Sequence, residues 1–312
     1  MGVLANFNSP GLALAAVGCG QGAPQDLYCV EHRSPPTAPT QTAAMPTPPI
    51  PAAGPPAAVR LYVGDAMPLA TGMVADLPQQ AARHAQVRRV QPGELLRLFD
   101  GRGCDWPAQV LEVGRKQVRV EVGAPLAVAL ELPAPVTLAL VVPANERMDT
   151  VVEKATELGA TCIQPLMSER SVLRLDGERA LRRQAHWQGV AIAACEQCGR
   201  ARVPEVAAVL PLLPWLQSLA ATCAAGQAGA RWLLSLRPGA RPLQAWAAQA
   251  GGGWTSVVTL SGPEGGLSPD EEDAALAAGF QAVNLGPRVL RADTAPLALL
   301  SWLSLQPSVV AD

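Results

Sequence analysis

The chain has 312 residues, of which 49% are hydrophobic, 16% charged and 4% aromatic. This composition excludes a wholly disordered protein or a coiled coil, and it provides enough apolar side chains for two domains with cores. The longest apolar runs, such as 136–142, are far shorter than the roughly 18 residues of a membrane span, so no transmembrane helix is expected. Because the net charge is −2, any contact with nucleic acid must use a local basic patch.

Arginine dominates the basic residues, since only Lys116 and Lys154 are lysines among the 24. The planar guanidinium suits phosphates and base edges, although a GC-rich genome produces the same bias without functional meaning. The odd number of cysteines, seven, favours a reducing cytoplasm. Cys195 and Cys198 form a C-x-x-C at the end of an apolar helical pattern. No second C-x-x-C follows, and the chain has three histidines, so neither a metal site nor a thioredoxin-type site is expected.

The N-terminal segment 1–57 contains 11 of the 30 prolines and few large apolar residues. Proline removes a backbone donor and restricts its neighbour, so a Pro/Ala-rich disordered tail is expected here. An alternative is that the start codon is assigned too far upstream. The first ten residues contain no lysine or arginine, which argues against a secretory signal.

Short β-like runs follow the tail and are separated by turn signals such as Pro92-Gly93. This spacing predicts a small all-β barrel or sandwich over residues 58–125. Arg83, Arg88 and Arg89 lie close together there, beside His84. The predicted strands are 59–63, 95–99, 106–113 and 117–122.

Strands and helices alternate from residue 136 onward, which predicts an α/β domain with a parallel sheet over residues 126–312. Asp149 is the expected N-cap of the first helix, and Gly159 is its expected C-cap. Ligands of such sheets bind beyond the carboxyl ends of the strands. The predicted strands are 137–142, 162–167, 232–236, 256–260 and 282–285, and the later helices are 178–198, 242–250, 269–278 and 292–303.

A glycine-rich loop, 262–266, follows the strand at 256–260. Its three glycines allow backbone N–H groups to approach a ligand closely, and Ser268 with Pro269 starts the next helix. The loop lacks the lysine of a P-loop, and Glu264 would repel a phosphate, so a cationic or donor-rich ligand is favoured. The alternative is an ordinary turn between a strand and a helix.

A second loop follows the strand at 282–285 and carries Arg288, Arg291, Asp293 and Thr294 just where a helix starts. The functional interpretation is a pair of arginines presented to a ligand. The alternative is that the arginines form salt bridges that only stabilise the start of the helix.

Together these loops resemble the paired C-terminal motifs of the SPOUT methyltransferases. Within them the chain is most similar to the RsmE family, the 16S ribosomal RNA uracil-N3 methyltransferases. The motifs are Gly-Pro-Glu-Gly-Gly at 262–266 and Leu-Gly-Pro-Arg-Val-Leu-Arg-Ala-Asp-Thr-Ala at 285–295, with earlier agreement at 153–159, 168–171 and 196–200 and a PUA-like segment at 84–90. The resemblance covers about residues 58–305, and it departs from the family at Asp293, where glutamate is usual.

The resemblance implies a PUA-like β-barrel for RNA binding, followed by an α/β domain with a deep trefoil knot. It also implies S-adenosylmethionine as cofactor, 16S rRNA in the small subunit as partner, a homodimer, a cytoplasmic location, and neither metal nor membrane. The cofactor loops would be 236–238, 260–266 and 285–291. The cofactor-binding residues implied are Leu236, Leu260, Gly262, Pro263, Glu264, Gly265, Gly266, Leu285, Gly286, Arg288, Leu290 and Thr294.

Removing the N3 proton of uracil leaves an anion, which a positive side chain can stabilise. Arg291, Arg288 and Asp293 are the expected catalytic residues, with Arg291 foremost. RNA capture is expected of Arg88, Arg89, Arg170, Arg174 and Arg200, with Arg182 and Arg183 as further candidates. The alternatives are a SPOUT enzyme that methylates a ribose 2′-hydroxyl and a non-catalytic ribosome-assembly protein that kept the fold.

Overall fold

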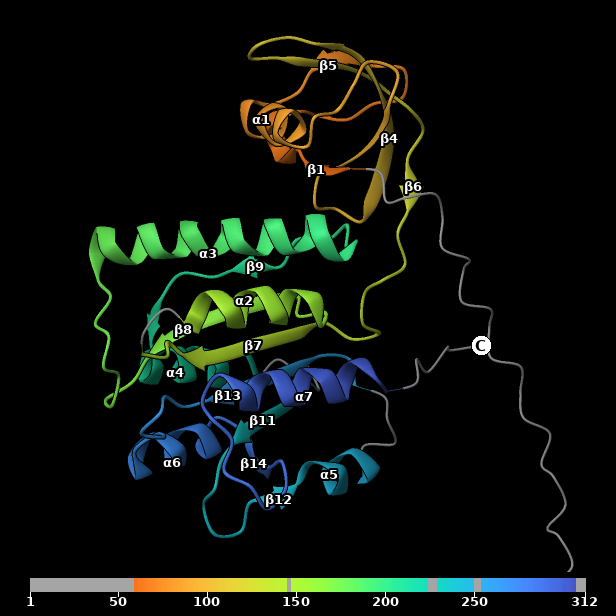
Figure 1. Ribbon diagram of the computed structural model, residues 1–312. Helices are drawn as coiled ribbons and strands as arrows, with labels where there is room; N and C mark the ends of the chain where they lie inside the picture. Colours follow the sequence, from red (N-terminus) through yellow and green to blue (C-terminus); the bar gives the residue numbers. More distant parts are fainter. Residues whose placement is uncertain (1–58, 145–146, 224–228, 250–253, 307–312) are drawn as a thin grey trace, which may run out of the picture. The chain divides into compact units, whose positions relative to one another are not determined.

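The computed structural model describes residues 59–144, 147–223, 229–249, 254–306. The predicted tail, 1–57, therefore lies outside the described residues. Two sheets organise the described chain, one formed by β1–β6 and the other by β7–β14 (Figure 1). No helix in the described ranges is long and apolar enough to cross a membrane.

The first sheet has the order β1-β3-β4-β5-β2, with β6 paired to β4. The β1–β3 ladder is parallel and the others are antiparallel. Period-two burial is clearest in β5, where Val118, Val120 and Val122 face the core and the residues between them are exposed. Its strands are β1 (Arg60–Tyr62), β2 (Val74–Asp76), β3 (Leu95–Phe99), β4 (Cys104–Val113), β5 (Val118–Val122) and β6 (Leu126–Ala127).

The predicted β-rich unit is present, but it is not all-β, because this region also contains helix α1 (Gln79–Val87) and a short 3-10 helix (Gly64–Ala66). Ala81, Ala82 and Ala85 lie on one face of α1 and are buried in the core of the first sheet. Alanine favours helix but gives a weak hydrophobic signal, so the helical period was not apparent. The four predicted strands were confirmed as β1, β3, β4 and β5; β3 has the predicted ends, and the ends of the other three differ by one or two residues.

The second sheet is entirely parallel, with the order β10-β8-β7-β13-β11-β14-β12 and β9 beside β8. This confirms the predicted α/β architecture. The strands are β7 (Val136–Val141), β8 (Cys162–Met167), β9 (Glu205–Val206), β10 (Leu210–Pro211), β11 (Ala230–Leu234), β12 (Arg241–Pro242), β13 (Val257–Ser261) and β14 (Gln281–Asn284). The helices are α2 (Arg147–Glu157), α3 (Gly177–Cys198), α4 (Leu212–Cys223), α5 (Leu243–Gln249), α6 (Pro269–Ala277) and α7 (Thr294–Ser304).

Helices cover both faces of the second sheet. Successive side chains of β7 point to opposite faces, and each set packs against helices. Leu138 and Leu140 join a core with side chains of α2, α3 and α7. Ala139 and Val141 join the opposite core with side chains of α4 and α6. A strand buried on both faces is expected to be a continuous apolar run, as this one is.

Asp149 does not cap α2, contrary to prediction, because the helix begins by Arg147. Its carboxylate instead accepts a hydrogen bond from Trp187 Nε1 at 3.1 Å and pairs with His186 Nε2 at 2.7 Å. Both partners lie on α3, so Asp149 joins the two helices. Gly159 has a φ of +96° just after α2, as a glycine at this position should.

Arg200 was expected to bind RNA, and the structure corrects this. Its side chain is only 3% exposed. The guanidinium donates to both carboxylate oxygens of Glu131, and to the carbonyl oxygens of Thr156 at 2.7 Å and Ala160 at 2.9 Å. A buried guanidinium with these four acceptors joins segments within the protein and is not available to a phosphate.

A testable consequence concerns stability. Replacing Arg200 by alanine leaves Glu131 and two carbonyl groups without their donor, and breaking a buried pair of this kind costs about 3 kcal/mol. Urea denaturation of the Arg200→Ala variant should show that loss in the free energy of unfolding. Arg182→Ala is the matched control, because Arg182 forms only an exposed pair with Glu178 at 3.4 Å and should change little. Equal stability of the two variants would contradict this account.

Candidate functional site

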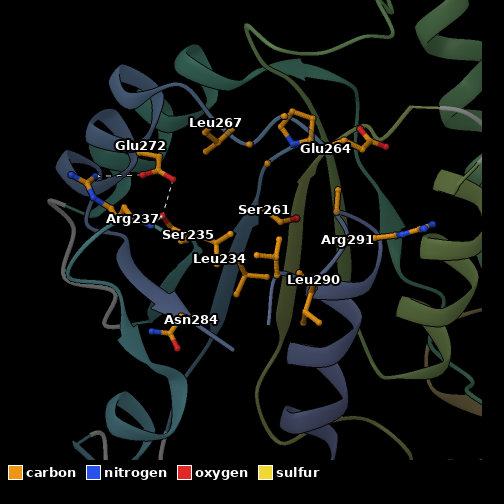
Figure 2. A pocket seen from close by; sticks show the side chains of 18 of the residues that line it. Leu234, Ser235, Arg237, Ser261, Glu264, Leu267, Glu272, Asn284, Leu290 and Arg291 are labelled. Carbon is orange, nitrogen blue, oxygen red and sulfur yellow. Dashed lines mark hydrogen bonds and ion pairs between the residues drawn. The ribbon is translucent and has the colours of Figure 1, made fainter. Parts of the chain in front are cut away.

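The carboxyl ends of β11, β13 and β14 meet at one edge of the second sheet and open into a cavity of about 1000 Å³. Leu234, Ser261 and Asn284, near the ends of these strands, all line it. Figure 2 shows Leu234, Ser261 and Leu290 together near the centre of the cavity. This is the position at which parallel α/β sheets bind ligands.

The glycine-rich loop, 262–266, forms one wall of the cavity, and its glycines serve different purposes. A Cβ at Gly262 would lie 2.9 Å from the backbone nitrogen of Leu267, so a side chain there would displace the loop. Gly266 has a φ of +67°, which residues with side chains rarely adopt. A Cβ at Gly265 would make only ordinary contacts, the nearest at 3.8 Å. The loop conformation therefore requires glycine at positions 262 and 266, whereas packing does not require it at position 265.

Hydrogen bonds from the start of α6 and from the segment after β8 hold the glycine-rich loop in place. Ser268 and Glu271 form a capping box at the start of α6, as the sequence predicted for Ser268. Glu271 also accepts from the backbone N–H of Glu169 at 2.7 Å. Arg170 donates to the carbonyl oxygens of Gly265 at 2.9 Å and Leu267 at 3.1 Å. The segment after β8 therefore fixes the conformation of the glycine-rich loop.

A polar group of side chains lies on the α6 side of the cavity. Ser235 Oγ donates to Glu272 at 2.8 Å, and Arg237 pairs with Asp273 at 2.9 Å and with Glu272 at 3.7 Å. Figure 2 shows these contacts to Glu272 as dashed lines. Ser261 Oγ, at the end of β13, is buried and has no hydrogen-bond partner among the described residues. Such an orphaned hydroxyl beside a cavity is a position where a ligand can supply the missing partner.

The two arginines of the second loop differ in their surroundings from Arg237, which is paired with Glu272 and Asp273. Arg288 and Arg291 line the cavity and are exposed, and within the described ranges neither guanidinium has an ion-pair or hydrogen-bond partner. In Figure 2 the Arg291 side chain points away from Leu234. Asp293 pairs with Arg147 at 3.4 Å instead of with either of them. The alternative of arginines bound in salt bridges at the helix start is therefore not what the structure contains.

Most of the residues expected at the cofactor site do line the cavity. They are Leu236, Gly262, Pro263, Glu264, Gly265, Gly266, Leu285, Arg288 and Leu290. Leu260, Gly286 and Thr294 are not among its lining residues: Leu260 is fully buried, and Thr294 Oγ1 contacts Asp293. Glu264 accepts a hydrogen bond from the backbone N–H of Ala144 at 3.1 Å.

Sequence reasoning missed several residues of this cavity. Ser235 follows the end of β11, and Glu272 and Asp273 lie in the N-terminal half of α6, so their convergence depends on the order of the strands. Arg147 was also missed, although it precedes Asp149 in the motif-bearing segment. Acidic residues in a first helical turn are usual for any helix, so the sequence carried no specific signal for Glu272.

The residues expected to bind RNA are dispersed. Arg88 and Arg89 are exposed at the C-terminal end of α1, where Arg89 has a φ of +57°. Arg174 donates to the carbonyl oxygen of Glu169 at 3.3 Å, and Arg170 is engaged in holding the glycine-rich loop. No cluster of three metal-binding side chains occurs in the part of the chain that the structure describes.

The chain matches two known domain families, one in the region of each sheet. Residues 130–304 match the RNA methyltransferase domain family, and residues 77–123 match the RNA methyltransferase PUA domain family. A protein of Mycobacterium bovis named ribosomal RNA small subunit methyltransferase E is 38% identical over 251 residues, which are 80% of this chain and 92% of that protein. The protein of that name from Synechocystis is 34% identical over 70% of this chain and 68% of its own length.

Solved structures agree with these matches. The crystal structure of a ribosomal RNA small subunit methyltransferase E from Neisseria gonorrhoeae, bound to S-adenosylmethionine, superposes with a TM-score of 0.70 at 36% identity. It covers 79% of this chain and 96% of that one. A methyltransferase of Legionella pneumophila with bound S-adenosylmethionine gives a TM-score of 0.71 at 31% identity, over 79% and 96% of the two chains. The resemblance found in the sequence is confirmed, and the chain belongs to the ribosomal RNA small subunit methyltransferase E family.

Proposed function

We propose that this protein transfers a methyl group from S-adenosylmethionine to N3 of a uridine in the 16S rRNA of the small ribosomal subunit. The observation that carries the proposal is the cavity at the ends of β11, β13 and β14, which is lined by the glycine-rich loop and by two arginines that have no partner among the described residues. Relatives of the same fold and family hold S-adenosylmethionine in their crystal structures.

The residues of the cavity fit this cofactor. S-adenosylmethionine carries a sulfonium and an ammonium group, and Glu264, Glu272 and Asp273 place carboxylates around the cavity. The exposed backbone of the glycine-rich loop and the orphaned hydroxyl of Ser261 offer hydrogen bonds to its polar groups. When bound, the cofactor supplies a methyl group already attached to a good leaving group.

Arg291 and Arg288 would act on the RNA substrate. Uracil N3 becomes an effective nucleophile when its proton is removed, and an adjacent guanidinium lowers the energy of the resulting anion. Both arginines are free of internal partners among the described residues, so they can contact the base or its flanking phosphate. Asp293 would act indirectly, because its carboxylate holds Arg147 at the edge of the cavity. Alignment of the base with the methyl group then contributes much of the rate acceleration.

The architecture is proposed to be a PUA-like domain over residues 58–125 and a knotted methyltransferase domain over residues 126–312. Strand β11 lies between β13 and β14, so the connection from β13 to β14 crosses it, and the connection from β11 to β12 crosses β14. Two successive connections that each pass over a strand are compatible with the deep trefoil knot that the family resemblance implies, a rare feature in proteins.

A homodimer and capture of RNA by the β-rich domain complete the proposal. Leu236 and Val289 line the cavity yet are 66% and 78% exposed, which suits apolar side chains that a second subunit covers. Arg88 and Arg89, exposed on α1, are proposed to bind the phosphate backbone, with Arg174 as a further contact. The cytoplasm is the proposed location, since ribosomal subunits are assembled there.

The proposed activity predicts a specific loss from the ribosome. Mass spectrometry of small-subunit RNA from a deletion strain should show one 3-methyluridine missing, and the purified protein with S-adenosylmethionine should restore it on isolated subunits. A missing 2′-O-methyl nucleotide would instead indicate a ribose methyltransferase. Unchanged RNA would mean that the protein is a non-catalytic assembly factor.

The fit of the cofactor depends on Gly262. In the Gly262→Ala variant the new methyl group meets the backbone of Leu267, so the loop must shift, and we expect a dissociation constant for S-adenosylmethionine at least about tenfold higher. Isothermal titration calorimetry measures this directly. Gly189→Ala is the matched control, because a Cβ there meets nothing within 4 Å and its position in α3 favours alanine. Equal affinities of the two variants would show that the loop tolerates a side chain.

The proposed role of Arg291 predicts that its loss slows methyl transfer but hardly changes the affinity for S-adenosylmethionine. The Arg291→Ala variant should methylate small subunits about 100-fold more slowly, the magnitude typical of losing one group that stabilises developing charge. Its affinity for S-adenosylmethionine should change less than about threefold, which corresponds to under about 0.7 kcal/mol. Arg179→Ala, which removes an exposed arginine at the start of α3, is the control. Near-normal turnover of Arg291→Ala would remove it from the mechanism.

A further inference from the structure

A second cavity lies at the same edge of the second sheet as the cavity described above, which is called the cofactor cavity from here on. The second cavity has a volume of about 570 Å³ and lies beyond the carboxyl ends of β8 and β10. The starts of α4 and α6 and the segment before α3 complete its lining. The proposed methyl transfer makes no use of this space.

The two cavities share a wall that is formed by two short segments. After β8, Glu169 lines the second cavity, and its neighbour Arg170 lines the cofactor cavity. Along residues 267–270, before and at the start of α6, successive residues line the cofactor cavity and the second cavity in turn. A molecule in the second cavity therefore lies directly behind the wall of the cofactor cavity.

Much of the lining of the second cavity is apolar, and part of it is exposed. Leu175 and Leu212 are buried, whereas Leu210 is 38% and Leu213 45% exposed. Leu213 lies in the first turn of α4, and Leu210 belongs to β10, which stands at one end of the strand order. Exposed apolar side chains around a hollow are typical of a surface that a partner covers.

The charges around the second cavity are mostly negative. Glu169, Asp176 and Asp270 are exposed, and none of their carboxylates has an ion pair or hydrogen bond with the residues that the structure describes. Asp176 is the N-cap of α3, yet its side chain accepts no hydrogen bond from that helix. The one cation among the lining residues, Arg174, donates to the backbone carbonyl of Glu169 at 3.3 Å. Three uncompensated carboxylates favour a cationic partner.

We propose that the second cavity binds a segment of a small-subunit protein in which an apolar side chain lies next to a lysine or arginine. The inference rests on the proposed function, which makes the small ribosomal subunit the substrate. Proteins bound to RNA are themselves rich in lysine and arginine. The apolar lining receives the apolar side chain, and the carboxylates of Glu169, Asp176 and Asp270 receive the cation.

Other occupants fit the same surface less well. RNA is disfavoured, because the three carboxylates repel its phosphate groups. A small organic cation such as a polyamine would leave Leu210 and Leu213 uncovered. A symmetric contact with a second copy of this chain would bring the same carboxylates together and so place like charges side by side.

Binding measurements on the full chain test the proposal. Leu213→Gln removes the exposed apolar contact, and the double variant Asp176→Asn with Asp270→Asn removes two of the carboxylates. Each is expected to raise the dissociation constant for isolated small subunits about tenfold. The dissociation constant for S-adenosylmethionine should stay within about twofold of the native value, which also shows that the variants are folded. Leu181→Gln and Glu178→Gln, which change exposed residues of α3, are the matched controls and should bind subunits as the native chain does.

The sign of the change separates protein from RNA as the occupant. If RNA lay in the second cavity, loss of two negative charges would tighten binding to subunits and to protein-free 16S rRNA alike. Unchanged or tighter binding of subunits by the double variant would therefore overturn the inference, while methylation by the native chain would still support the proposed function. A native chain that neither binds nor methylates subunits would overturn the proposed function, and this inference with it.

Photo-crosslinking identifies the occupant from one exposed position. With p-benzoylphenylalanine in place of Leu213, irradiation in the presence of isolated small subunits should attach the chain to a peptide of a subunit protein that contains lysine or arginine. The same group in place of Leu181 is the control and should not label that peptide. Attachment to 16S rRNA or to a second copy of the chain, or no attachment, would overturn the proposal.

Discussion

The position of β11 between β13 and β14 is the constraint on which the site depends. Five backbone pairs join β11 to β13 and three join it to β14, all of them parallel. Parallel pairing directs the three carboxyl ends to one edge, so loops that are distant in the sequence face one cavity. The glycine-rich loop follows β13, and the arginine-bearing loop follows β14.

Buried polar contacts hold the helices and loops that surround this sheet in position. Arg200 draws together Glu131, the end of α2 and the turn that follows it, while Asp149 links α2 to α3 through His186 and Trp187. Arg60 is held by Asp105 at 2.6 Å and caps a carbonyl at the end of α3. Buried charges of this kind are stable only when their partners are all present. The joint between the two sheets therefore depends on ion pairs and hydrogen bonds as well as on apolar packing.

Much of the fold was predictable because its signals are local. Strand β8 and helix α6 were predicted nearly residue for residue, the helix from Ser268, Pro269 and the acids after them. Helix α4 was missed, since its first residues, Leu212–Leu216, are almost all apolar and show no helical period. Asp149 was assigned to the wrong role because its partners lie 37 and 38 residues away. Arg200 was misassigned for the same reason, since burial cannot be read from residue type.

The site shows the same division between local and distant signals. The glycines and the two arginines were visible because each loop is short and its composition unusual. Ser235 and Glu272 meet across the cavity only because β11 lies beside β13 and α6 follows β13. The resulting charge pattern is ordered: Arg237 is neutralised by Glu272 and Asp273 on one side, whereas Arg288 and Arg291 have no described partner on the other. A bound cofactor whose cationic groups face the acids would leave those two arginines for an anionic substrate, which is the charge separation that methyl transfer to RNA requires.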